Sequence, residues 1–155
     1  MKKLITIGLV LLLVSGGVAY SWFEKKQTST KMEKNIEIVA LASGLKYKIL
    51  IPGDGAAAAK GNHVDVHYSG WLDVAGEPGK LFDSSKGPQR GEPFSFVLGA
   101  GYVIRGWDEG VAGMKVGETR RLYIPSTLGY GARGAGRDIP PHAALIFDVE
   151  LIAIK

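Results

Sequence analysis

The 155-residue chain contains no cysteine, and it has only a small excess of charge. The missing cysteine excludes disulfide bonds, thiolate catalysis and zinc sites built on cysteine. The 19 basic residues outnumber the 15 acidic ones, for a net charge of +4. This mild, dispersed excess is a weak indication of nucleic-acid binding, so we expect no nucleic-acid partner. Hydrophobic residues make up 46% of the chain, which is enough for a sizeable core.

The motifs of nucleophilic and cofactor-dependent enzymes are also lacking. No serine lies in a G-x-S-x-G context. The stretch GYGARG at 129–134 matches G-x-G-x-x-G, but AGRDIPP follows it and cannot begin the helix that a dinucleotide needs. We therefore reject a dinucleotide site and expect no cofactor.

Three side chains on one predicted strand have the chemistry of metal ligands. His63, Asp65 and His67 alternate along the strand and project from one face, a donor set that suits zinc or iron. The alternative is that they form the solvated face of an amphipathic strand. We favour that alternative and expect no metal, because no second shell is recognisable nearby.

Long hydrophobic runs are absent except for one, from Leu4 to Phe23, which follows two lysines. The run is long enough to cross a bilayer as a helix, and it also resembles a signal peptide cut after Ala19. We favour a retained membrane anchor, because the run ends in an aromatic cluster typical of the membrane interface: Tyr20, Trp22 and Phe23. In both cases we expect an exported protein, periplasmic or otherwise extracytoplasmic, which is membrane-anchored if the segment is retained.

The sequence thus divides into three parts: a signal peptide or membrane anchor at 1–23, a polar linker at 24–43 and a folded domain at 44–155. Alternation of apolar and polar residues in the domain predicts strands at 45–51, 63–72, 93–99, 119–125 and 144–154. The stretch DVAGEPGK at 73–80 is typical of a loop, and LFDSS follows it. The predicted class is α+β, an antiparallel sheet of about five strands wrapped around one short α-helix and preceded by a hydrophobic N-terminal helix.

The short helix is predicted in VIRGWDEGV at 103–111. Ile104, Trp107 and Val111 share one face at helical spacing, while a glycine stands on each side of the tryptophan. A helix of this length is unstable alone and must pack on the sheet. The domain has more aromatic residues than so small a core requires, so Trp107 either fills the core or lines a pocket.

Asp83 is an isolated acid between Phe82 and Ser84 in an otherwise apolar stretch. From the residues alone two roles stay open. It either forms a turn by bonding its own backbone, or it serves as a polar group in a site.

Five stretches, taken in order, resemble one known family: VHYSGWL, LFDSS, PFSFVLGAGYVIRGWDEGVAGMKVGE, YGARG and IPPHAALIFDVEL. They are similar to those of the FKBP-type peptidyl-prolyl cis-trans isomerases, the immunophilins that bind tacrolimus and rapamycin. The resemblance covers the domain from about Gly44 to Lys155 and does not extend to the N-terminal segment.

The resemblance implies a hydrophobic pocket. Its catalytic residues would be Asp83, Tyr130, Ile104 and Trp107, with Trp107 as the floor under the substrate proline and the Ile104 N–H as the donor to the bound carbonyl. Its substrate-binding residues would be Tyr68, Phe82, Phe94, Val103 and Phe147. The chain departs from the family pattern at Ala135, where well-known members have histidine, and in a longer loop after Gly70.

The implied function is acceleration of X–Pro bond rotation in proteins that fold outside the cytoplasmic membrane, by desolvation and hydrogen bonding in an aromatic pocket. The alternative is a chaperone or binding module that holds apolar or proline-containing segments with incidental isomerase activity. The expected partners are proline-containing polypeptides, macrolide inhibitors such as tacrolimus and rapamycin, and a membrane contacted through the N-terminal segment. Rotation breaks no bond, which fits the lack of nucleophile and cofactor motifs.

Overall fold

The computed structural model describes residues 37–87 and 91–155. The predicted hydrophobic helix at 1–23 and most of the predicted linker lie outside the described residues. Within the part that is described, no helix combines the length and the hydropathy needed to cross a bilayer.

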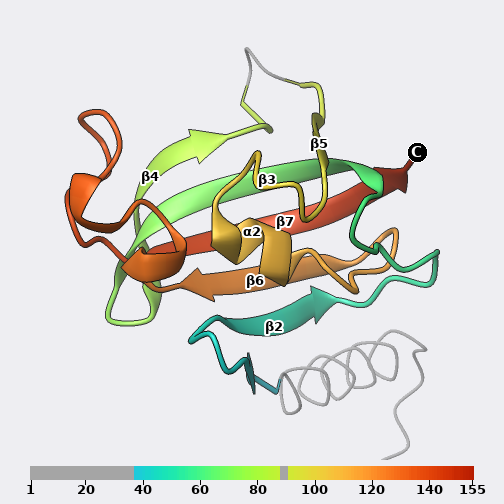
Figure 1. Ribbon diagram of the computed structural model, residues 1–155, viewed down its shortest axis with the longest axis horizontal. Coiled ribbons are helices and arrows are strands. Elements are labelled where there is room, and N and C mark those ends of the chain that lie inside the picture. The colour runs from blue at the N-terminus through green and yellow to red at the C-terminus, as the bar shows by residue number, and fades with distance from the viewer. Residues whose placement is uncertain (1–36, 88–90) are drawn as a thin grey trace, which may run out of the picture. The chain divides into compact units, whose positions relative to one another are not determined.

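The described residues form one antiparallel sheet and one short helix (Figure 1). The strands are β1 (Val39–Ala40), β2 (Lys46–Ile51), β3 (His63–Val74), β4 (Glu77–Ser84), β5 (Phe94–Val97), β6 (Thr119–Ile124) and β7 (Leu145–Ile154). They are ordered β1-β2-β6-β7-β3-β4, and β5 pairs with β3. Helix α2 (Arg105–Gly110) follows β5, and two 3-10 turns, η1 (Ser126–Leu128) and η2 (Gly131–Arg133), follow β6.

The α+β class and the single short helix are confirmed, but the sheet has seven strands rather than about five. The stretch taken for a loop at 73–80 contains the end of β3, a two-residue turn and the first half of β4. Ala75 and Gly76 both have positive φ, of 55° and 88°, which is the twist that suits a tight hairpin. The first half of β4, EPGK, contains a proline and a glycine and shows no alternation of apolar and polar residues, and this is why the pattern missed it.

Strand β1 was also missed. Its two residues pair with β2, Val39 opposite Tyr47 and Ala40 opposite Lys46. The sheet therefore begins within the stretch predicted as linker, before Gly44. Two residues are too few to show a periodicity.

Helix α2 lies against one face of the sheet and contacts β6. Its two glycines allow this close approach, because a Cβ on Gly106 would lie 2.5 Å from the Ile124 side chain and one on Gly110 would lie 2.6 Å from Leu122. On the buried side of the helix, Trp107 is 5% exposed and Val111 is fully buried. The predicted helical face is thus the face that packs on the core.

A buried arginine on β6 supports the end of the helix. Arg120 donates hydrogen bonds to the carbonyl oxygens of Gly110 and Ala112, at 2.9 and 3.4 Å, and so satisfies groups that a helix end leaves open. Its charge is paired with Glu118 at 2.7 Å, and its guanidinium lies 4.2 Å from the centre of the Tyr47 ring. A helix of six residues is therefore held by the sheet rather than by its own propensity.

Candidate active site

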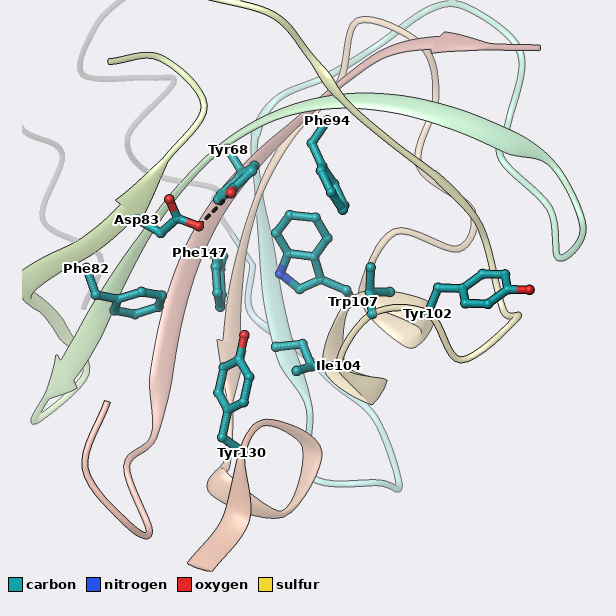
Figure 2. Close-up of a pocket in the computed structure, with 10 residues that line it drawn as sticks. Tyr68, Phe82, Asp83, Phe94, Tyr102, Ile104, Trp107, Tyr130 and Phe147 are labelled. Atoms are coloured by element: carbon teal, nitrogen blue, oxygen red, sulfur yellow. Dashed lines mark hydrogen bonds between the residues drawn. The ribbon is translucent and has the colours of Figure 1, made fainter. Parts of the chain in front are cut away.

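Beside α2 the sheet and its loops enclose an open cavity of about 560 Å³ (Figure 2). This volume lies in the range of small-molecule and peptide pockets. The lining residues are Tyr68, Phe82, Asp83, Phe94, Tyr102, Val103, Ile104, Trp107, Tyr130 and Phe147. All nine residues predicted for the site line this one cavity, and Tyr102 is added to them.

Trp107 forms the floor of the cavity. Its ring meets those of Tyr68 and Phe147 edge to face, with centroids 4.9 and 5.3 Å apart. The indole N–H is buried and has no conventional hydrogen-bond partner among the described residues. Figure 2 shows the indole nitrogen on the side of the ring that faces Phe147. The floor is thus apolar, and the rings of Tyr68 and Phe147 pack against it.

An irregularity in β4 sends two successive side chains into the cavity. Asp83 pairs with Gly70, but Leu81 pairs with Trp71, so Phe82 lies in a bulge between them. In a regular strand Phe82 and Asp83 would point to opposite faces. The facing residue must be glycine, since a Cβ on Gly70 would lie 2.5 Å from Phe147 and 2.8 Å from Phe82.

The Asp83 carboxylate makes the local turn interaction and also lines the cavity. One oxygen accepts the Ser84 backbone N–H at 3.0 Å, which is the local turn interaction. The other accepts the Tyr68 hydroxyl at 2.7 Å, inside the cavity. The buried Ser85 accepts the Tyr68 backbone N–H at 2.8 Å and so fastens the end of β4 to β3. The carboxylate is therefore a fixed group of the pocket wall.

Tyr130 reaches the cavity from the loop between η1 and η2. Figure 2 shows its hydroxyl directed toward the middle of the pocket. Partial burial, followed by the nearby negative charge of Asp83, raises the pKa of the Tyr130 hydroxyl above its usual value. The group therefore keeps its proton throughout the neutral pH range and stays a hydrogen-bond donor.

The loop before α2 is held by a side chain of the helix itself. The Asp108 carboxylate accepts the N–H groups of Gly99 and Gly101, at 2.8 and 3.0 Å. The Ile104 carbonyl accepts the Trp107 N–H at 2.9 Å and starts the helix. The Ile104 N–H makes no hydrogen bond within the described part of the chain, so it is available to a ligand.

A model of the FKBP-type peptidyl-prolyl cis-trans isomerases matches residues 55–152. FK506-binding protein 1 of Dictyostelium discoideum is 54% identical over 112 residues, 72% of this chain and 99% of that protein. Peptidyl-prolyl cis-trans isomerase FPR2 of Saccharomyces cerevisiae is 56% identical over 98 residues, 63% of this chain and 69% of that protein. The crystal structure of AtFKBP13 matches with a TM-score of 0.68 and 40% identity, covering 77% of this chain and 99% of that one. The chain belongs to the FKBP-type peptidyl-prolyl cis-trans isomerases.

In this FKBP-type isomerase the three suspected metal ligands do not form a site. Asp65 is only 8% exposed, because Ser95 of β5 and the C-terminal Lys155 cover it and hydrogen-bond or pair with its two oxygens. The ring of His67 contacts Ser85 instead, with Nδ1 3.0 Å from the hydroxyl oxygen. Among the described residues there is no cluster of three or more such side chains able to hold a metal. The alternation placed Asp65 on a solvated face, but β5 pairs along β3 and buries it.

Tyr102 is the lining residue of the FKBP-type pocket that sequence reasoning missed. It stands next to Val103 and Ile104, and it follows a glycine with a φ of 77°. Those two neighbours were the available signal. The sequence could not show that the loop before α2 brings Tyr102 to the same cavity as Val103 and Ile104.

Proposed function

We propose that this FKBP-type isomerase accelerates X–Pro rotation in polypeptides that fold outside the cytoplasmic membrane, and that the reacting amide is held in the aromatic pocket. The observation that carries the mechanism is the pocket itself, whose apolar walls surround a fixed carboxylate, a protonated hydroxyl and a free N–H. The extracytoplasmic setting rests on the sequence of residues 1–23, with its two lysines and long apolar run.

The chemistry needs no covalent intermediate. Rotation about a peptide bond costs about 18–20 kcal/mol because it removes C–N resonance, and uncatalysed X–Pro isomers exchange over about tens of seconds. Water favours the charge-separated resonance form of the planar amide. Transfer of the amide into an aromatic pocket weakens that preference and lowers the barrier to twisting.

The polar groups supply orientation. The Ile104 N–H donates to the substrate carbonyl, and the Tyr130 hydroxyl is a second donor at the rim, while the proline ring rests on Trp107. Asp83 holds the Tyr68 hydroxyl and presents a fixed negative charge beside the twisting bond. Each tenfold gain in rate needs only about 1.4 kcal/mol of selective stabilisation, so a few such contacts are sufficient.

The pocket is also proposed to bind macrolide inhibitors. Relatives of this chain carry the name FK506-binding protein, and FK506 is tacrolimus. Addition of tacrolimus should inhibit isomerisation of a proline peptide. Full activity at saturating drug would overturn this part of the proposal, and it would implicate the departures at Ala135 and after Gly70.

The second candidate is a chaperone or binding module that holds apolar segments. The exposed aromatic rings at the cavity mouth favour it, since Phe94 is 43% exposed and Tyr102 is 80% exposed. An apolar holder has no use for a carboxylate in its wall, because a carboxylate is costly to desolvate. The twisting amide changes its charge distribution, and fixed polar groups favour that change selectively.

The variants Asp83→Leu and Tyr130→Phe separate the two candidates. We expect each to lower kcat/KM for a proline peptide by about tenfold, with a smaller effect on binding of an unfolded client. Tyr123→Phe removes a hydroxyl from β6 outside the pocket and is the matched control. Melting temperature, isomerisation and client binding are measured on every variant. Parallel losses in all three measurements would overturn the catalytic assignment of these residues.

A further inference from the structure

Tyr102 is the most exposed large apolar side chain of the described residues, at 80%. It makes no ring contact and no side-chain hydrogen bond within the part of the chain that the structure describes. At this exposure the ring contributes little packing to the fold. Figure 2 shows it at the edge of the pocket, extended beyond Trp107 and away from Phe82 and Phe147.

The backbone that presents this ring is firmly held. The two N–H groups just before it, at Gly99 and Gly101, bond the Asp108 carboxylate. Asp108 follows Trp107 in the same helix, so the loop is attached directly to the element that forms the pocket floor. An exposed aromatic residue on a rigid loop offers a large contact surface at a small cost in conformational entropy.

The polypeptide substrate must continue out of the pocket on either side of the proline. A chain whose carbonyl is bound by the Ile104 N–H passes the loop that carries Tyr102, only two residues away. We propose that Tyr102 is a specificity-determining residue, which contacts apolar side chains of the substrate that flank the X–Pro pair. The isomerase thereby prefers apolar, unfolded chains to short polar peptides. This inference rests on the proposed placement of the substrate in the pocket.

The test compares two peptides that share the same X–Pro pair. One carries leucine and phenylalanine on both flanks, and the other carries serine and glycine. We expect Tyr102→Ala to lower kcat/KM about fivefold more for the apolar-flanked peptide than for the polar one, a factor that corresponds to about 1 kcal/mol. The loss should lie in KM, since the ring touches flanking residues rather than the twisting bond. Tyr102→Phe should keep the preference.

Leu81→Ala is the matched control, because it removes another exposed apolar side chain, 51% exposed, that does not line the cavity. Leu81→Ala should leave the ratio of kcat/KM for the apolar-flanked peptide to kcat/KM for the polar-flanked peptide unchanged. Equal effects of Tyr102→Ala on both peptides, or the same shift in Leu81→Ala, would overturn the inference. Failure of the unsubstituted protein to isomerise either peptide would instead count against the proposed function.

Discussion

Trp107 has two tasks at the scale of a single residue. Its ring contacts Tyr68, Phe94, Phe96 and Phe147, with centroid distances between 4.9 and 6.0 Å, and so it closes the core. The same ring forms the floor of the cavity. Structural and functional effects of a substitution must therefore be measured separately.

The variant Trp107→Leu is expected to retain the fold and to lose about tenfold in kcat/KM, equivalent to about 1.4 kcal/mol, because leucine fills part of the core but supplies no flat floor. Trp107→Ala should in addition lower the free energy of unfolding by about 3–5 kcal/mol. Urea unfolding and a proline-peptide assay on both variants check this. Unchanged turnover in Trp107→Leu would mean that the residue serves the core alone.

At the scale of elements, the position of α2 decides the shape of the site. The helix rests on β6 through Gly106 and Gly110, and Arg120 of β6 donates a hydrogen bond to the carbonyl oxygen of Gly110, the last residue of the helix. Trp107 and Asp108, which set the floor and the loop before it, both belong to this helix. Any displacement of α2 therefore changes the floor and the rim together.

Gly106→Ala tests the close approach of the helix. Alanine is about 1 kcal/mol better than glycine in a helix, so without a clash the variant would be more stable. A Cβ at this position would lie within 3.0 Å of three atoms of the fully buried Ile124. We therefore expect a loss of about 1–3 kcal/mol in the free energy of unfolding, together with lower kcat/KM.

Gly87→Ala is the control for Gly106→Ala, because no atom of the described residues lies within 4 Å of a Cβ there. Thermal unfolding of the two variants and the peptide assay provide the measurements. A stabilised Gly106→Ala protein would contradict the described packing of α2 on β6.

The attachment of β5 to β3 should depend on pH. Asp65 of β3 is hydrogen-bonded to Ser95 of β5 and paired with Lys155, and these two partners lower the pKa of its carboxyl below the usual value. A carboxyl with a lowered folded-state pKa stabilises the fold above its unfolded pKa, and that contribution is lost as the pH falls through the folded value.

The variant Asp65→Asn should therefore be less stable than the unsubstituted protein at neutral pH. The difference should shrink below a pH of about 4, where the unfolded carboxyl is already protonated. Urea unfolding at several pH values measures it, with Asp54→Asn, in an exposed loop, as the control. A stability difference that stays constant across the whole range would show that the charge of Asp65 is not its source.

At the scale of the whole molecule, the described residues carry a core of their own. The sheet begins at Val39 and ends at Ile154, and Leu45, Leu98, Met114 and Leu151 are fully buried between them. All of these core residues belong to the compact unit that spans Ile36–Lys155. The isomerase domain is therefore expected to be separable from the N-terminal segment.

A fragment starting near Lys34 should fold and isomerise a proline peptide without the first 33 residues, because it retains the whole described sheet. Circular dichroism and the peptide assay check this. The full chain should sediment with membranes if the apolar run is a retained anchor. A soluble product that begins after Ala19 would identify the run as a cleaved signal, and an unfolded fragment would show that the domain boundary is misplaced.

The sequence by itself determined the parts of the protein whose pattern is local. Strong alternation predicted β3, β6 and β7 close to their observed bounds, and helical spacing predicted that Ile104, Trp107 and Val111 share a face. The ordered motifs also indicated nine residues that line one cavity. The strand and helix signals depend on residues only a few positions apart, whereas the nine cavity residues were indicated by the resemblance to the FKBP family.

Only the tertiary structure decided what depends on a neighbouring strand. Alternation cannot show that β5 and Lys155 cover Asp65, or that a bulge opposite Gly70 turns both Phe82 and Asp83 into the pocket. It also cannot show that Asp108 holds the loop that presents Tyr102. A periodic pattern reports which face of a segment is apolar, whereas burial and direction are set by the residues that pack against it from distant parts of the chain.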